Sequence, residues 1–335
     1  MGRLLAVLAV VVVACAPAVP AEVTASKAVT STAPETTRPT AGAAPSSTAP
    51  ATPAPSVSTT AAPPSPTTSP TTSAPTTSSI TARTFPDGRY RGTVGFGDDL
   101  AADVFAPEAP GAYPVAVLVH GGGWVAGDRR SLWPLAEGLA ARGFVAYTPE
   151  YRTLARGGRF PVTVDDVACA VRLARRDAAR FTSTPDRVVV IGHSAGAHLG
   201  ALVAFGGDEF GTSCPDPEAQ GVVGFVGLAG PYDIERLELV LVPFFGTRLA
   251  DDPEPWRRGN PFTYATEDLG VPTLLVHGEA DPVVPPFFSE ELAEALDEAG
   301  TPVTLRLLAG VDHSTVTDPA VVGDLIADWV ASLGP

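Results

Sequence analysis

From residue 84 onward, short apolar runs alternate with stretches in which apolar residues recur every three or four positions. The continuous apolar runs are typical of strands buried on both faces of a sheet. Two antiparallel strands are expected within 94–105, ahead of the first buried run. Strands that alternate with helices are typical of βαβ units, so the pattern predicts an α/β fold with a mostly parallel sheet. The expected strands are 115–119, 144–148, 187–191, 222–228, 273–277 and 303–308, and the expected helices are 131–142, 164–174, 195–205, 290–298 and 321–332.

The helix through 164–174 carries arginines on faces other than its apolar one, and more follow shortly after it. Such a group is typical of a solvated helix face. We therefore expect these side chains to lie in water: Arg172, Arg175, Arg176 and Arg180.

The first 83 residues have a different composition, dominated by Ala, Val, Thr, Ser and Pro. The apolar run 4–13 is too short to span a bilayer and predicts an export signal over 1–14. The sequence Val-Val-Ala before Cys15 resembles a bacterial lipobox, which implies cleavage before Cys15 and a lipid on its thiol. Cleavage at nearby small residues is the alternative. We expect an exported protein, either a cell-surface lipoprotein held at the membrane by this lipid or a secreted one.

Residues 15–83 lack any apolar period and predict a disordered stalk, because too little apolar surface is available to offset the entropy of ordering the chain. Residues 84–335 predict one globular domain. The chain has a formal net charge of −15, and residues 84–335 hold 18 basic and 35 acidic side chains, a net charge of −17. Such a surface repels phosphate backbones, which argues against a nucleic-acid partner.

The most specific pattern is Gly192-His193-Ser194-Ala195-Gly196, which a predicted strand enters and a predicted helix leaves. This is the context of a nucleophile elbow, a sharp turn that exposes its serine. The helix N-terminus behind the serine offers backbone N–H groups and the positive end of the helix dipole to a developing oxyanion. Ser194 is therefore the candidate nucleophile.

The strand 115–119 runs directly into the sequence His-Gly-Gly-Gly-Trp at 120–124. Consecutive glycines leave backbone N–H groups uncovered and permit conformations closed to other residues, as an oxyanion-binding loop requires. Together with the elbow, this sequence resembles the esterase and lipase families of the α/β-hydrolases, near the hormone-sensitive-lipase and bacterial esterase branches. The resemblance implies that an oxyanion hole is formed by Gly122, Gly123 and Ala195, and that Trp124 lines or braces the acyl pocket.

A serine nucleophile of this type needs an acid and a histidine, in the chain order Ser, Asp or Glu, His. Asp281 follows the predicted strand 273–277, at the edge where active groups gather in parallel sheets. The stretch 277–285 also resembles the acid loop of the family, H-G-x-x-D-x-x-V-P. Glu279 is the alternative candidate for the acid, but it lies nearer the turn and matches the acid loop of the family less well. His313 is the only histidine after Asp281 and is the candidate general base.

The remaining candidates for chemistry are interpreted as structural. Asp312 is expected to be a loop acid. No His, Cys and carboxylate cluster has the spacing of a zinc site, so we expect neither a metal nor a cofactor. The histidines that we interpret as structural are His120, His193, His198 and His277.

The resemblance covers about residues 90–335 and implies the α/β-hydrolase fold, with a mostly parallel central sheet flanked by helices and a small or absent cap. It also implies hydrolysis of small to medium acyl or aryl esters by a Ser-His-Asp triad through an acyl-enzyme. Two departures matter: no helical cap precedes residue 120, and the elbow has His193 where the hormone-sensitive-lipase branch commonly has Asp. Both point to simpler secreted esterases or to arylformamidase-like enzymes. The alternatives are an amide or peptide hydrolase of this fold and an inactive surface binding module.

Any lid over such a site would come from the irregular stretch 231–271. Its aromatic side chains are candidates for an acyl or aryl pocket, alongside plain packing: Phe244, Phe245, Trp256, Phe262 and Tyr264. Cys169 and Cys214 are the two cysteines of the globular part. Export favours a disulfide between them, and a buried thiol with a free loop thiol is the alternative.

Overall fold

The computed structural model describes residues 83–84, 89–96, 100–214 and 221–334. The predicted signal peptide, Cys15 and nearly all of the predicted stalk lie outside the described residues. Among the helices within the described ranges, none has the length and apolar character needed to cross a bilayer.

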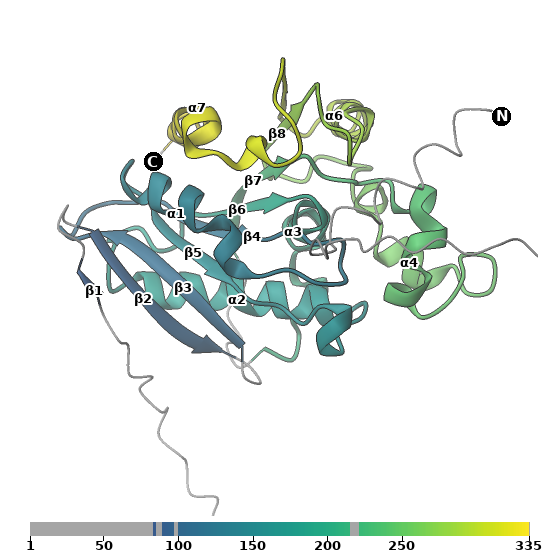
Figure 1. Ribbon diagram of the computed structural model, residues 1–335, viewed down its shortest axis with the longest axis horizontal. Coiled ribbons are helices and arrows are strands. Elements are labelled where there is room, and N and C mark those ends of the chain that lie inside the picture. The colour runs from purple at the N-terminus through teal and green to yellow at the C-terminus, as the bar shows by residue number, and fades with distance from the viewer. Residues whose placement is uncertain (1–82, 85–88, 97–99, 215–220, 335) are drawn as a thin grey trace, which may run out of the picture. The chain divides into compact units, whose positions relative to one another are not determined.

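In the described part of the chain, nine strands form one sheet in the order β1-β2-β3-β5-β4-β6-β7-β8-β9 (Figure 1). Neighbours from β5 to β9 pair in parallel, and β1, β2, β3 and β5 pair antiparallel. The predicted mostly parallel sheet is confirmed. The strands are β1 (Arg83–Thr84), β2 (Arg89–Phe96), β3 (Leu100–Pro107), β4 (Val115–Val119), β5 (Val145–Pro149), β6 (Val188–His193), β7 (Val222–Leu228), β8 (Thr273–Gly278) and β9 (Val303–Leu308).

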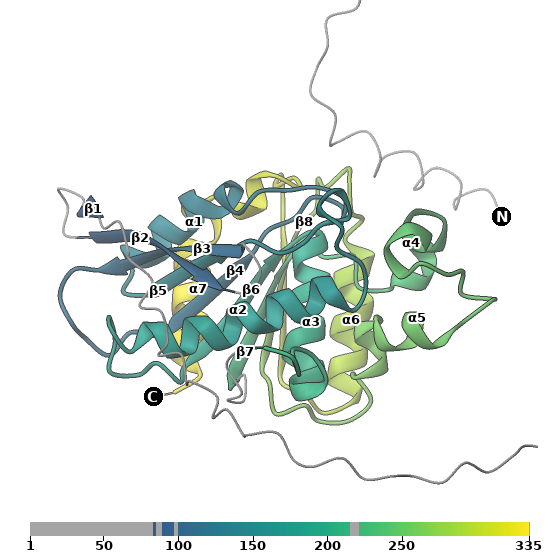
Figure 2. The same ribbon diagram turned by 90° about the horizontal axis from the view of Figure 1, so that it is seen from below.

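Helices cover both faces of this sheet (Figures 1 and 2). Helices α1 (Trp133–Ala140) and α7 (Pro319–Ser332) share one core with the sheet. On the opposite face, the core includes residues of α2 (Val162–Ala178), α3 (Ala195–Gly206) and α6 (Phe287–Glu298). Strand β4 shows why its run is continuously apolar: Val115, Val117 and Val119 enter the second core, and Ala116 and Leu118 enter the first.

The insertion 231–271 forms two short helices, α4 (Glu238–Phe245) and α5 (Glu254–Arg258), with 3-10 turns beside them. Phe244 and Trp256 are fully buried and Phe245 is 6% exposed, and Phe262 and Tyr264 pack partly buried against the same core. Core packing therefore accounts for Phe244, Phe245 and Trp256, the alternative that the sequence interpretation allowed. For Phe262 and Tyr264, the lining of a substrate pocket stays a prediction.

The arginines after 170 do not share one solvated face. Arg172 is 6% exposed and donates to the carbonyl oxygen of Gly211, with Asp208 beside it. Arg172 lies one helical turn after Ala168, on the face of α2 that the segment around Gly211, just before Cys214, covers. A disulfide with an S–S distance of 2.04 Å joins Cys169 of α2 to Cys214. The prediction of a fully solvated group was wrong for Arg172, because a segment distant in the sequence covers that turn of the helix.

Candidate active site

The elbow follows β6 and turns sharply at Ser194, whose φ of 54° and ψ of −125° are rare for a residue with a side chain. The Ser194 N–H donates to the carbonyl oxygen of Leu228, at 2.9 Å, and so fixes the turn against β7. Gly196 must lack a side chain, because a Cβ there would collide with the Val119 carbonyl group of β4. Close approach of α3 to the sheet thus raises the serine above the ends of the strands.

The glycine loop after β4 adjoins this serine. A Cβ on Gly121 would lie 2.9 Å from the Cβ of Ser194. Gly122 and Gly123 have φ values of 130° and 59°, and the Gly122 carbonyl oxygen accepts the N–H groups of Val125 and Ala126, which closes a tight turn. Within the described residues, the backbone N–H groups of Gly122, Gly123 and Ala195 have no acceptor. The loop and the helix therefore bring uncommitted donors to the neighbourhood of Ser194.

The start of the glycine loop is held by His120 and Tyr151. The Tyr151 hydroxyl donates to the His120 carbonyl oxygen at 2.7 Å, and the two rings stack with centroids 4.2 Å apart. The His120 Nδ1–H donates to the Gly121 carbonyl oxygen at 2.7 Å. Burial lowers the pKa of His120, which favours a neutral ring. His120 thus has the structural role that the sequence interpretation gave it.

Trp124 ends the loop with a φ of 60° and is 1% exposed. Its carbonyl oxygen accepts the Leu154 N–H at 2.9 Å, and its indole N–H donates to Nδ1 of His198 at 3.1 Å. Of the two roles expected for Trp124, the burial supports bracing the loop rather than lining a pocket. The contact to His198 was not foreseen, since nothing in the sequence connects α3 with residue 124.

The acid and the base meet at the carboxyl ends of β8 and β9. His313 Nδ1 lies 2.7 Å from Asp281 Oδ2, while Oδ1 accepts the N–H groups of Val283 and Val284 at 2.8 and 2.9 Å. A carboxylate only accepts hydrogen bonds, so a neutral His313 has its proton on Nδ1 and its lone pair on Nε2. That tautomer is the one a general base needs.

The environment of Asp281 keeps it ionised. Burial by itself would raise its pKa, but hydrogen bonds from His277, His313 and the Val284 N–H, with the nearby positive charge that His313 can carry, hold the pKa of Asp281 well below its usual range. His277 Nε2 lies 3.4 Å from Asp281 Oδ2 and 2.8 Å from the Val284 carbonyl oxygen, to which it donates. His277 therefore steadies the acid loop and faces the carboxylate at longer range.

The elbow and the base loop are joined through His193. Its Nε2–H donates to the backbone carbonyl oxygen of His313 at 2.8 Å, and the two rings have centroids 4.8 Å apart. Burial, with a contribution from His313, lowers the pKa of His193 to about 4. The residue before the nucleophile thus holds the main chain of the base. No hydrogen bond of the Ser194 side chain occurs within the described residues; such bonds often tighten only when substrate binds.

The other acids take no part in this constellation. Glu279 is exposed, and its N–H donates to Leu308. Asp312 accepts the Ser314 and Thr315 N–H groups at 3.0 and 2.8 Å; hydrogen bonds from Thr315 lower its pKa. Asp312 therefore caps a turn, as a loop acid does. Within the described ranges, no three His, Cys, Asp or Glu side chains are arranged to hold a metal ion.

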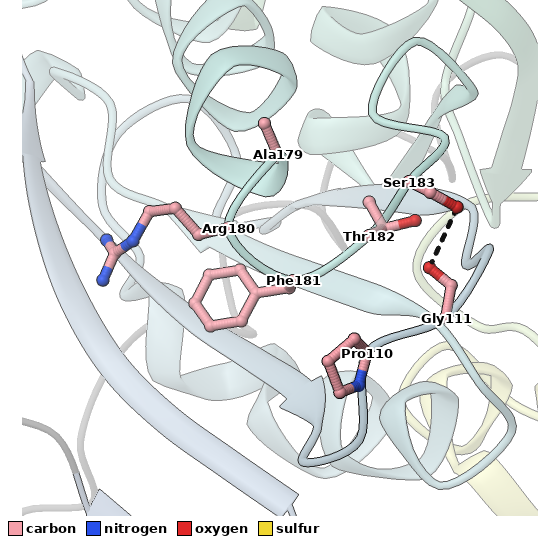
Figure 3. A pocket seen from close by; sticks show the side chains of 7 residues that line it. All are labelled: Pro110, Gly111, Ala179, Arg180, Phe181, Thr182 and Ser183. Carbon is pink, nitrogen blue, oxygen red and sulfur yellow. Dashed lines mark hydrogen bonds between the residues drawn. The ribbon is translucent and has the colours of Figure 1, made fainter.

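A surface pocket of about 450 Å³ lies elsewhere on the domain (Figure 3). Its lining residues precede β4 and β6, and Gly111 bridges to Thr182 there. It is therefore at the amino ends of the parallel strands, opposite the edge that carries Ser194, Asp281 and His313. Because active groups of parallel sheets gather at the carboxyl ends, this pocket is not the candidate active site.

Known proteins resemble the chain in sequence and in structure. The model of the BD-FAE family matches residues 102–296. Esterase LipQ of Mycobacterium tuberculosis is 28% identical over 235 residues, which are 67% of this chain and 55% of LipQ. Esterase LipC of the same organism is 32% identical over 218 residues, 58% of this chain and 52% of LipC. The chain thus spans about half the length of these curated relatives.

Solved esterase structures share the architecture. A truncated carbohydrate esterase from gut microbiota superposes with a TM-score of 0.62 at 20% identity, covering 69% of this chain and 90% of its own. Esterase 2 of Thermogutta terrifontis with bound propionate gives a TM-score of 0.62 at 23% identity, with 74% and 95% covered. These likenesses show the α/β-hydrolase fold that the sequence predicted. With a family model that matches more than half of its length, the chain belongs to the BD-FAE family.

Proposed function

We propose that this protein is a serine carboxylesterase that hydrolyses small to medium acyl or aryl esters. The observation that carries the proposal is the pairing of His313 with Asp281 at 2.7 Å, on the same sheet edge as the strained Ser194. The relatives support the same class, since LipQ and LipC are esterases and the Thermogutta terrifontis enzyme was seen with propionate and with butyrate.

In the proposed reaction, Ser194 Oγ attacks the ester carbonyl carbon while its proton passes to the lone pair on His313 Nε2. The carbonyl electrons move to oxygen, and the N–H groups of Gly122, Gly123 and Ala195 stabilise that oxyanion. Loss of one such donor typically costs about 3–4 kcal/mol of barrier. Asp281, ionised by its surroundings, stabilises the imidazolium that forms.

The tetrahedral intermediate then expels the alcohol, which takes the proton from His313 Nε2 and leaves an acyl group on Ser194. Water attacks this acyl-enzyme, giving its proton to the same nitrogen, and the acid is released as Ser194 regains its proton. Each half-reaction uses one base and one set of oxyanion donors. Nothing in the sequence requires a cofactor.

Ser194→Ala tests the proposal. With p-nitrophenyl acetate and butyrate, kcat should fall by roughly 10⁶-fold, as when a nucleophilic serine is removed elsewhere, and a fluorophosphonate probe should no longer label the protein. Ser183→Ala is the matched control, since Ser183 lines the pocket at the opposite end of the strands. Turnover that survives in Ser194→Ala would overturn the assignment. Folded wild type that resists labelling would instead favour an inactive binding module, and turnover of formanilides in preference to esters would favour the amide alternative.

We also propose that the protein is exported and carries a lipid on Cys15. The disulfide between Cys169 and Cys214 supports export, because cytosolic thiols are normally kept reduced. Two or three acyl chains are enough for stable attachment. Cell fractionation of the full chain and of Cys15→Ser tests this proposal: the full chain should sediment with membranes, and the variant should not. A soluble full chain would contradict lipid anchoring.

A further inference from the structure

The buried end of the glycine loop is connected to the insertion by two hydrogen bonds that meet on one histidine. Trp124 Nε1–H donates to His198 Nδ1 at 3.1 Å, and His198 Nε2 lies 2.8 Å from the carbonyl oxygen of Gly259. Both rings are buried, His198 completely so. The indole and imidazole rings also pack edge to face, with centroids 5.5 Å apart.

The hydrogen-bond partners of His198, Trp124 and Gly259, are compatible with only one protonation state of its ring. An indole nitrogen can only donate, so Nδ1 must carry a lone pair, and the single ring proton resides on Nε2 and is donated to Gly259. A second proton would set an N–H against the Trp124 N–H. Burial lowers the pKa of His198 to about 4, which keeps the ring neutral at ordinary pH. The ring therefore serves as a fixed bridge from the loop to α5.

The anchor on the far side is firm. Gly259 follows α5, and its N–H donates to the Pro255 carbonyl oxygen at 2.9 Å. Trp256 of α5 is fully buried and donates from Nε1 to the Thr247 carbonyl oxygen at 3.1 Å. His198 is itself on the first turns of α3, directly behind Ser194. One ring thus fixes the glycine loop relative to both the elbow and the insertion.

The loop needs such an anchor because its backbone is strained. Trp124 follows Gly123 in the left-handed region, with φ values of 60° and 59°, and a side-chain-bearing residue stays there only where its surroundings impose it. If the indole shifts, the peptide groups before it rotate, and with them the N–H groups of Gly122 and Gly123. A misplacement of about 1 Å can lower a rate by about 100-fold.

We propose that His198 is a positioning residue for the oxyanion loop: its Nδ1 holds Trp124, and thereby the Gly122 and Gly123 N–H groups, in the geometry that stabilises the transition state. This inference rests on the proposed esterase function. It differs from a purely structural role, because it predicts a loss in kcat of each intact site and not only a smaller folded fraction.

Two substitutions of His198 test its two hydrogen bonds separately. His198→Gln keeps a donor that can reach Gly259 but removes the acceptor for Trp124, whereas His198→Asn keeps an acceptor near the position of Nδ1 and removes the donor. Val203→Ala is the control for stability, because Val203 is fully buried on the same helix and has no contact to Trp124 among the hydrogen bonds or ring contacts. Each variant is titrated with a fluorophosphonate, so that kcat is expressed per reactive Ser194.

We expect His198→Gln to lower kcat per titrated site by tenfold to a hundredfold with little change in KM, and His198→Asn to recover most of that loss. Phosphonylation of Ser194 should slow in parallel with kcat. Val203→Ala should change the melting temperature and leave kcat per site as it is. If His198→Gln does not fold, Trp124→Phe removes the same hydrogen bond from the donor side and should show the same kcat loss.

A wild-type kcat per titrated site in His198→Gln and Trp124→Phe would overturn the inference, as would equal losses in the Gln and Asn variants. Wild type that neither hydrolyses esters nor reacts with the probe would overturn the proposed function, and this inference with it. The two failures are therefore distinguishable, since the first needs an active wild type.

Discussion

Asp281→Asn separates the role of the carboxylate charge from that of its shape. Asp281 Oδ1 accepts two backbone N–H groups at 2.8 and 2.9 Å, so the single oxygen of an amide must take that position. The new NH₂ group then faces His313 Nδ1, where the structure has an N–H donor at 2.7 Å from Oδ2. To accept from the amide, the imidazole must move its proton to Nε2.

The other tautomer cannot take the Ser194 proton, because its lone pair faces the amide. In another serine hydrolase with this arrangement the same substitution lowers kcat by about 10⁴-fold, which corresponds to about 5.5 kcal/mol of barrier. We expect a loss of this size here, with KM changed far less. Initial rates of p-nitrophenyl acetate hydrolysis at pH 8 measure kcat, and circular dichroism and thermal melting establish that the variant is folded.

Glu279→Gln is the matched control, because Glu279 is an exposed carboxylate two residues earlier on the same loop. Its kcat should stay within about twofold of wild type, a change of about 0.4 kcal/mol in the barrier, because the exposed Glu279 side chain takes no part in the acid–base pair. A folded Asp281→Asn variant that keeps more than a hundredth of the wild-type kcat would refute the reasoning. If kcat fell as much in Glu279→Gln as in Asp281→Asn, the assignment of Asp281 as the acid of the triad would be contradicted.

Three further predictions concern the loop, the disulfide and pH. Gly122→Ala should lower kcat by about 10²–10³-fold, because its Cβ would collide with the Ala126 carbonyl group. The Cβ of Gly123→Ala would meet open space, so the only cost is the strain of a side chain at a φ of 59°, and kcat should fall less than in Gly122→Ala; equal kcat values would contradict the loop geometry. Replacing Cys169 and Cys214, which are 45 residues apart, by Ala should lower the free energy of unfolding in urea by about 4 kcal/mol, and an unchanged midpoint would contradict this. Burial lowers the pKa values of both His198 and His193 from 6.5 to about 4, so the unfolded chain binds two protons in that window that the folded chain does not. Stability should be full above pH 6.5 and fall by about 3 kcal/mol for each of these histidines towards pH 4; a midpoint equal at pH 7 and pH 5 would count against it.

The sequence predicted the sheet because its strands are continuously apolar, and a strand buried on both faces leaves that mark. The sequence also predicted Ser194 as the nucleophile from a local pattern, because a strand, a sharp turn and the start of a helix follow one another within ten residues. Helix starts were harder to predict: α6 begins at Phe287, three residues before the expected position. The residues ahead of it are apolar and proline-rich, and they gain helical order from packing that a periodic pattern does not contain.

Side chains covered by distant segments could not be predicted in this way. Arg172 looks solvated on a helical wheel, and only the chain around Gly211, brought there beside the Cys169–Cys214 disulfide, gives its guanidinium a buried acceptor. Phe244 and Trp256 looked available to a substrate because their stretch lacks a pattern. In the structure their burial holds α4 and α5 on the core, which makes the insertion a support for the loop around Trp124.

The histidines show most clearly what one sequence leaves open. His313 was chosen by chain order alone, yet the rings of His193 and His277 also lie close to the acid–base pair. Hydrogen bonding separates them: His193 donates Nε2–H to the His313 carbonyl oxygen, His277 to that of Val284, and His198 to that of Gly259. A ring whose Nε2–H donates to a main-chain carbonyl oxygen has no lone pair on Nε2 with which to accept the serine proton. His313 directs Nδ1 to a carboxylate instead, so its Nε2 is the one left to act as a base, and the three other rings fix the loops that surround it.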